Sequence, residues 1–146
     1  MLIHEVCKAC RLTKKAIEYY EEQGLICPQV LENGYRDFSA KEIEQLKKIA
    51  ILRKLGVSVA DIQRVLNENN QAALYNVSIK KALEIETMKS KQELVQKLVQ
   101  NQDWEYTRLQ LEILEQKQTI SQRLLNVFPG HYGKYVSLHF ALYLNE

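Results

Sequence analysis

The chain of 146 residues divides near residue 70 in how often glycine and proline interrupt it. Before residue 70 these two residue types separate short hydrophobic segments, whereas after it neither appears until Pro129 and Gly130. Glycine and proline end or break helices, so only the second part can form long, uninterrupted ones. The division predicts a small domain of short elements followed by an extended helical region, and a mostly α fold class.

The first part begins with two short helices. Residues 3–10 have the apolar spacing of a helix, and we expect Thr13 and Gly24 to be the N-cap and the terminating C′ residue of the next one. Two helices joined by such a short turn form a helix-turn-helix motif.

Residues 29–38 (QVLENGYRDF) are expected to form a β-hairpin, because Asn33 and Gly34 suit the positive φ angles of a type I′ turn. Ser39 and Glu42 then make a capping box, which predicts the start of another helix.

A second helix-turn-helix is indicated by similar signals. Gly56 is expected to end the helix that begins after Ser39, and Ser58, with Asp61 three residues later, to start the next one.

A polar segment with helical periodicity runs from about residue 71 to residue 100. At 1.5 Å per residue, such a helix is about 45 Å long. Its apolar stripe is too narrow for a buried helix, and we expect no other part of the chain to cover it. The pattern predicts a coiled coil with a second copy of the chain. The stripe consists of Leu74, Val77, Met88, Leu94, Val95, Leu98 and Val99.

Asp103 is expected to be the N-cap of a further helix, in which apolar residues recur at steps of about three and four. These residues are Tyr106, Leu109, Ile113, Ile120, Leu124 and Val127. The aromatic tail beyond Pro129 and Gly130 is expected to form a last amphipathic helix.

Composition and charge exclude some classes of protein. Hydrophobic residues make up 46% and charged residues 26% of the chain, as in a folded protein. No apolar run approaches the roughly 20 residues of a membrane span, and there is no signal peptide, so we expect a cytoplasmic protein with no membrane contact. The formal net charge of +2 identifies no partner, but Lys8, Arg11, Lys14 and Lys15 form a local basic cluster.

Signals for catalysis and metal binding are weak. The sequence contains no Gly-rich phosphate loop and no nucleophile elbow, so we expect no enzymatic activity. A Cys₃His zinc site can be drawn from His4, Cys7, Cys10 and Cys27. Cys7 and Cys10 also suit the buried side of the first helix, and we expect neither a metal nor a cofactor.

The second helix carries the residue types that a DNA-recognition helix needs. Thr13, Lys14 and Lys15 occupy its first turn, from which side chains can reach base edges in the major groove. Tyr19 lies further along, where its hydroxyl can meet the DNA backbone, and Tyr20 is expected to pack inward.

The hairpin can serve as a wing, with Tyr35 and Arg36 beside its tip to bind a phosphate or enter the minor groove. Each of these side chains alone would be an ordinary exposed polar residue. Their combined order of helix, turn, helix and wing favours nucleic-acid binding.

Residues 3–66 resemble the DNA-binding domain of the MerR family of bacterial transcription regulators, over a little under half of the chain. The residues that match are Ile3, Glu5, Val6, Thr13, Ile17, Tyr19, Tyr20, Glu21, Gly24, Leu25, Asn33, Gly34, Tyr35, Arg36, Ser39, Leu55, Gly56, Ser58 and Ile62.

This resemblance implies a homodimer that binds double-stranded DNA at a pseudo-palindromic operator and controls transcription by bending and untwisting it. It implies a winged helix-turn-helix domain in residues 1–70, an antiparallel dimerisation helix in residues 71–101 and C-terminal helices in residues 102–146. The side chains expected to contact DNA are Arg11, Thr13, Lys14, Lys15, Tyr19, Tyr35, Arg36 and Lys54.

The sequence departs from the family pattern in three ways. Arg11 stands where the family usually has a turn glycine, and a left-handed non-glycine residue costs about 1 kcal/mol. Glu18 stands where an arginine is common, which removes a cation from the DNA face. No cysteine follows Cys27, which argues against thiol-based metal sensing.

In the MerR family the C-terminal part usually senses an effector. Residues 128–146 resemble the beginning of the C-terminal region of some longer members, so we expect a small-molecule effector to bind in the C-terminal part, residues 102–146. The residues expected to bind it are Trp104, Tyr132, Tyr135, His139 and Tyr143. The alternative function is a coiled-coil protein-interaction module with no role in DNA binding.

Overall fold

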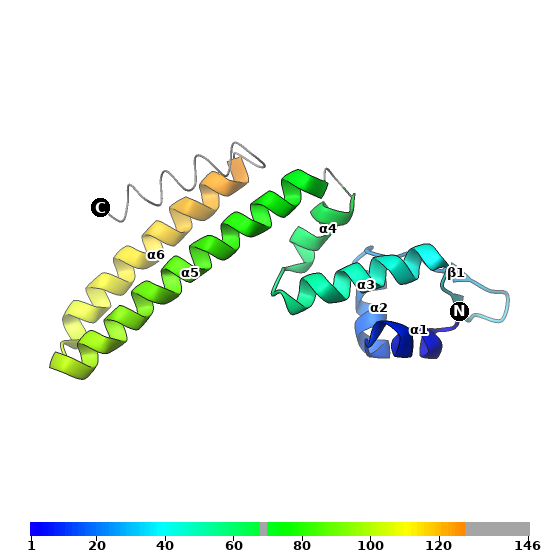
Figure 1. Ribbon diagram of the computed structural model, residues 1–146, viewed down its shortest axis with the longest axis horizontal. Coiled ribbons are helices and arrows are strands. Elements are labelled where there is room, and N and C mark those ends of the chain that lie inside the picture. The colour runs from blue at the N-terminus through cyan, green and yellow to red at the C-terminus, as the bar shows by residue number, and fades with distance from the viewer. Residues whose placement is uncertain (68–69, 128–146) are drawn as a thin grey trace. The chain divides into compact units, whose positions relative to one another are not determined.

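The computed structural model describes residues 1–67 and 70–127. It is mostly helical, with one small antiparallel hairpin, which confirms the predicted fold class. The chain forms two compact units, Met1–Asn70 and Gln71–Glu146, which we call unit 1 and unit 2 (Figure 1).

Unit 1 begins with helices α1 (Ile3–Cys10) and α2 (Lys14–Glu22). Arg11 ends α1 in the left-handed conformation, with φ 54° and ψ 44°. Thr13 is the N-cap of α2, because its side chain accepts a hydrogen bond from the backbone N of Ala16 at 3.1 Å. The predicted helix-turn-helix is therefore present, with the left-handed turn made by an arginine.

Strands β1 (Gln29–Val30) and β2 (Arg36–Asp37) form the predicted hairpin, with Val30 opposite Arg36. The predicted type I′ turn is wrong, because Gly34 has φ +85° whereas Asn33 does not have the positive φ that such a turn requires.

The hairpin tip is instead a turn from Leu31 to Gly34, closed by the Gly34 N–H donating to the Leu31 carbonyl at 2.9 Å. Asn33 accepts a hydrogen bond on Oδ1 from the Tyr35 N–H at 3.1 Å. The Asn33 side chain thus provides a hydrogen-bond acceptor for the Tyr35 N–H. At the hairpin tip only Gly34 adopts a left-handed backbone conformation.

Helices α3 (Ala40–Lys54) and α4 (Val59–Asn67) complete unit 1. Both begin as predicted: Ser39 and Glu42 form a capping box, and the Ser58 hydroxyl accepts from the Asp61 N–H at 3.2 Å. The turn between the two helices is held by Arg53, whose guanidinium donates to the Val57 carbonyl at 3.0 Å.

The core of unit 1 is continuous across its helices. Helix α1 contacts α2 and α3, and α4 contacts α3. Each of the four helices contributes buried apolar side chains to this core, and Phe38, directly after β2, contributes another. The core includes Val6, Ile17, Tyr20, Phe38, Leu46, Ile49, Ile62 and Val65.

Unit 2 contains α5 (Asn70–Asn101) and α6 (Trp104–Val127), which lie side by side and antiparallel (Figure 1). The turn between them has Gln102 at φ 50°, and Asp103 Oδ1 accepts from the Tyr106 N–H at 3.0 Å. The prediction that Asp103 caps a new helix is confirmed.

The expectation that no part of the chain covers the predicted apolar stripe is confirmed for Leu74, Met88, Val95 and Val99, which stay exposed. It is wrong for Leu94, which is buried on the side of α5 that α6 covers. Gln118 Nε2 on α6 donates to Thr87 Oγ1 on α5 at 3.2 Å. Lys97 on α5 donates to the Tyr106 hydroxyl at 3.0 Å, and this hydrogen bond raises the pKa of Lys97. Sequence periodicity identified each helix but gave no sign that the turn folds one back on the other.

Helix α5 has two apolar faces on opposite sides. The side chains toward α6 include Ile79, Leu83, Thr87 and Leu94. A second row stays exposed in the single chain, and at about 100° per residue its centre lies roughly half a turn from the first face. We call it the outer row: Leu74, Ile85, Met88, Val95 and Val99.

Helix α6 turns a mixed surface toward α5, where Leu125 is buried together with the polar Thr107 and Ser121. Part of its predicted apolar face points elsewhere, since Leu109 and Ile120 remain exposed. Within the described part of the chain, no helix is long and apolar enough to span a membrane.

Candidate nucleic-acid interface

The first turn of α2 is exposed and carries two cations. Thr13, Lys14 and Lys15 are all accessible to solvent. Lys14 Nζ lies 3.9 Å from a carboxylate oxygen of Glu18, one turn further along. Such an exposed pair contributes little stability, so Lys14 can leave it at small cost when another acceptor is offered.

The two adjacent tyrosines of α2 point in different directions. Tyr20 is 7% exposed and belongs to the core, as predicted, whereas Tyr19 is 43% exposed. Their ring centroids are 5.8 Å apart with the planes tilted by 57°. The buried ring therefore supports the exposed one and limits where the Tyr19 hydroxyl can lie.

The wing is tied to the recognition helix by an ion pair. Arg36 Nε on β2 donates to both carboxylate oxygens of Glu21 on α2, at 2.9 and 2.8 Å. This contact fixes the wing beside α2 and leaves the terminal nitrogens of Arg36 available for a further acceptor. Tyr35, one residue earlier, is exposed at the tip of the hairpin.

Arg11 and Lys54 are also exposed. Arg11 lies in the turn directly before α2, so its backbone places it next to the first turn of the helix. Lys54 is the last residue of α3, and among the described residues it makes no ion pair or hydrogen bond that would join it to the other predicted residues.

Sequence reasoning missed the partners that position this surface. Glu21 and Arg36 are fifteen residues apart, so no local spacing rule connects them. Gln63 on α4 donates to the backbone carbonyl of Gln23, at the end of α2, at 2.6 Å. Both contacts link elements that only the tertiary fold brings together.

The cysteines form no metal cluster in the described residues, which hold no group of three or more histidine, cysteine or acidic side chains in ligand geometry. Cys10 is buried, its Sγ lies 3.9 Å from the Ile43 carbonyl oxygen, and burial raises the pKa of its thiol. Cys7 is partly exposed and Cys27 is exposed.

Of the residues predicted to bind an effector, only Trp104 lies within the described part of the chain. It is exposed at the start of α6. Tyr132, Tyr135, His139 and Tyr143 lie outside the described residues.

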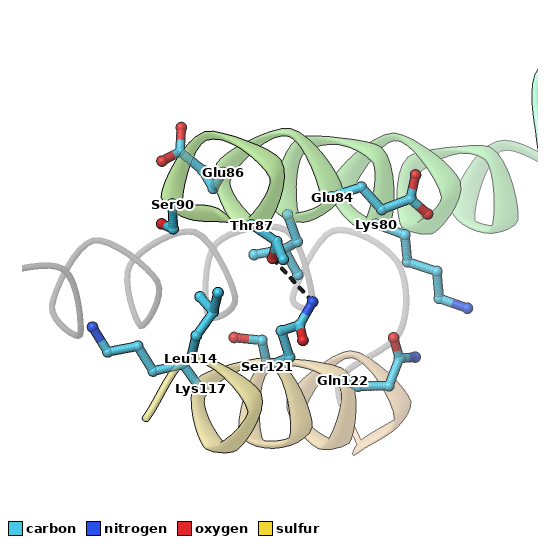
Figure 2. Close-up of a pocket in the computed structure, with 11 residues that line it drawn as sticks. Lys80, Glu84, Glu86, Thr87, Ser90, Leu114, Lys117, Ser121 and Gln122 are labelled. Atoms are coloured by element: carbon cyan, nitrogen blue, oxygen red, sulfur yellow. Dashed lines mark hydrogen bonds between the residues drawn. The ribbon is translucent and has the colours of Figure 1, made fainter. Parts of the chain in front are cut away.

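A cavity of about 160 Å³ lies between α5 and α6 (Figure 2). Leu83 and Leu114 supply its apolar lining, and the Gln118–Thr87 hydrogen bond crosses it. Ser121 also lines the cavity and is 6% exposed, and its hydroxyl makes no hydrogen bond to another described residue. Trp104 is not part of this lining.

A capped, exposed recognition helix followed by a hairpin wing and a second pair of helices defines unit 1 as a winged helix-turn-helix domain. Residues 1–69 match the family described as MerR HTH family regulatory protein. Unit 1 therefore belongs to the MerR family, as the sequence resemblance predicted.

The chain is also similar to bacterial proteins that are named as regulators. The HTH-type transcriptional regulator CueR of Yersinia pestis is 36% identical over 83 residues, which are 56% of this chain and 60% of CueR. The multidrug-efflux transporter 2 regulator of Bacillus subtilis (strain 168) is 31% identical over 83 residues, which are 30% of its own length. Both relatives are named as regulators.

The similarity extends beyond unit 1 in one of these comparisons. The HTH-type transcriptional regulator YfmP of Bacillus subtilis (strain 168) is 29% identical over 136 residues, which are 92% of this chain and 91% of YfmP. By contrast, the chain spans about 60% of the length of CueR.

Proposed function

We propose that the protein is a sequence-specific DNA-binding transcription regulator that acts as a homodimer on a pseudo-palindromic operator. The observation that carries this proposal is the contact between Arg36 and Glu21, which holds the wing against the last turn of α2, the helix whose first turn is exposed. One helix can then enter the major groove while the wing reaches the neighbouring backbone. The relatives named as transcriptional regulators support the same function.

The expected contacts divide into two kinds. Lys14 and Lys15 meet base edges, and Thr13 contributes from the N-cap position, where the helix dipole also favours a phosphate. Arg36 binds a phosphate. Contacts of the second kind set affinity without reading sequence. Arg11, Tyr19, Tyr35 and Lys54 are proposed to join Arg36 on the DNA backbone.

The outer row of α5 supports dimerisation. Met88 is 68% exposed and Val99 is 79% exposed, although both belong to a regular apolar row. Leu74, Ile85, Met88, Val95 and Val99 are spaced by eleven, three, seven and four residues, which matches a coiled-coil seam. Because α6 occupies the opposite side of α5, a second copy of α5 can dock on the outer row without displacing it. The proposed pairing is antiparallel.

A dimer of this kind would place two recognition helices on successive half-sites. We propose that the complex then bends and untwists the DNA between them, so that the deformability of that segment contributes to recognition. DNA binding places the protein in the cytoplasm.

Equilibrium binding to DNA upstream of the protein's own gene tests the proposal. Lys14→Ala and Lys15→Ala should lose sequence preference, whereas Arg36→Ala should weaken binding to all DNA about equally and reduce the salt slope by about one. Glu44→Ala on α3 is a control that removes an exposed member of an ion pair elsewhere in unit 1. An unchanged salt slope for Arg36→Ala would contradict the phosphate role.

The alternative is a coiled-coil interaction module whose unit 1 does not bind DNA. It predicts no DNA binding even at low salt, and no effect of Lys14→Ala or Arg36→Ala on any partner held by unit 2. Binding that weakens steeply with added salt would exclude it, since release of counterions from phosphates is the source of that dependence.

A specific observation also favours an effector role for unit 2. We propose that a small molecule binds in the cavity between α5 and α6, where Ser121 offers an unused hydroxyl beside Leu83 and Leu114. Native mass spectrometry of the purified protein tests this, with Ser121→Leu as the variant that fills the space. A bound mass that is lost in the variant supports the site, and the same bound mass in both proteins contradicts it.

A further inference from the structure

The outermost ridge of the recognition helix carries an acidic residue at its centre. Ile17 and Tyr20 are buried, and their position fixes the rotation of α2 about its axis. At about 100° per residue, Lys15, Glu18 and Glu22 then lie on the side opposite the core. This ridge is the part of α2 that would enter a groove most deeply.

Helix α2 carries two lysines and three glutamates, so its second half is anionic. The three carboxylates differ in what they do. Glu21 is engaged by Arg36, and Glu22 is the last residue of the helix. Glu18 lies one turn from the N-terminal end, close enough to base edges for a helix that presents its N-terminal residues to the groove.

The only ion pair of Glu18 among the described residues is the 3.9 Å contact with Lys14. Both side chains are largely exposed, and an exposed pair at this spacing contributes little to stability. The contact nevertheless keeps a cation and a carboxylate side by side on the surface that the proposed function turns toward the DNA.

The chemistry of a carboxylate limits what it can read. An ionised Glu18 accepts hydrogen bonds and cannot donate them. In the major groove the donors are the N4 amino group of cytosine and the N6 amino group of adenine, and adenine places its N7 acceptor beside that donor. Cytosine has no acceptor edge of its own in the groove, so it is the better partner for a group with two acceptor oxygens.

The neighbouring cation completes the match. The guanine paired with that cytosine presents only acceptors, O6 and N7, in the major groove, and these suit the Lys14 ammonium. A C·G base pair therefore presents a donor and an acceptor side by side, complementary to the carboxylate and the ammonium of the Lys14–Glu18 pair.

We propose that Glu18 and Lys14 together read one C·G base pair in each half-site, with Glu18 accepting from cytosine N4 and Lys14 donating to the guanine. This inference rests on the proposed function and names the base pair that its recognition helix selects. It gives the acidic residue on the DNA face a role in sequence choice. On an A·T base pair the carboxylate could still accept from adenine N6, but its second oxygen would face the N7 acceptor beside that donor.

The test is selection of binding sites from a randomised duplex library by the full chain, followed by binding measurements on the selected site. The parent should prefer C·G at one position of each half-site by about tenfold. Glu18→Ala should lose this preference while keeping the others. Glu18→Gln should shift it toward A·T, since an amide can both accept from N6 and donate to N7 of adenine.

Glu44→Gln is the matched control, because it neutralises an exposed glutamate that pairs with Lys48 at 3.7 Å on α3. It should leave the selected sequence unchanged. A Glu18→Ala profile identical to that of the parent would overturn the inference while leaving the regulator function intact. A parent that selects no sequence at all would overturn both, so the two failures are distinguishable.

Discussion

The two units of the chain bury their apolar residues to very different extents. In unit 1 the apolar faces of short helices close on one another, and the side chains of Phe38, Ile17 and Leu46 are almost fully inaccessible. In unit 2 two long helices share one face, while Met88 and Val99 on the outer row stay exposed. Short elements that change direction can surround a core, whereas two long helices lying side by side can cover only one side of each other.

This difference teaches which unit depends on a partner. Unit 1 has a closed core, capped helices and a wing tied down by an ion pair. Unit 2 leaves an apolar row at coiled-coil spacing uncovered. We therefore expect unit 1 to fold as a monomer and unit 2 to gain stability from association of two chains.

The largest effect is expected from opening the closed core. Phe38→Ala should destabilise unit 1 by about 3–5 kcal/mol, because it removes a buried ring and leaves a cavity. Hydrogen exchange resolved by residue should show lost protection in α1 to α4 and retained protection in α5 and α6. Val30→Ala, at an exposed strand position, is the control with little change. Equal loss of protection in both units would contradict their independence.

A smaller effect is expected from placing a charge on the outer row. Met88→Glu should raise the dissociation constant of the dimer by more than about tenfold, since each chain would bury a carboxylate in an apolar seam. Light scattering over a range of protein concentrations measures the change. Gln100→Glu introduces the same charge off the row and should leave the mass unchanged. A parent that is monomeric at micromolar concentration would refute the seam.

Removing a cap from unit 1 should cost about 1 kcal/mol. Thr13→Ala leaves the Ala16 N–H without its side-chain acceptor at the start of α2. Thermal unfolding should show the loss, and Thr13→Ser should restore most of it because serine keeps the acceptor oxygen. Full stability in Thr13→Ala would mean that water replaces the cap without cost.

The smallest effects on stability are expected at the non-glycine residues with a left-handed backbone. The described part of each unit contains one such residue. Arg11 has φ 54° and Gln102 has φ 50°. Arg11→Gly and Gln102→Gly should each stabilise the native state by about 0.5–1 kcal/mol, because glycine adopts this conformation without steric cost. Denaturant unfolding measures both. If Arg11→Gly stabilises the fold but weakens DNA binding, the Arg11 side chain contacts DNA, and this contact accounts for an arginine at a position where glycine would be more stable.

Local signals in the sequence predicted much of unit 1. Thr13, Ser39 and Ser58 begin their helices as expected, since a cap depends on residues only two or three positions away. The turn at Asn33 and Gly34 was mispredicted because the same dipeptide suits two turns. The asparagine side chain decides between them by bonding to the backbone of Tyr35.

The candidate site was predictable only in part. The exposed first turn of α2 and the inward direction of Tyr20 follow from helical periodicity. The partner of Arg36 does not, because Glu21 meets it only when the wing folds against α2.

By itself, the sequence determined where the helices begin and end, which residues lie on the surface of α2, and that unit 1 is a winged helix-turn-helix of the MerR family. These features depend on interactions between residues close together in the chain. The tertiary structure alone decided that α6 covers one side of α5 and leaves the outer row free, and that Glu21 holds Arg36. Such contacts join residues far apart in the chain, and their energies exist only once the fold has brought them together.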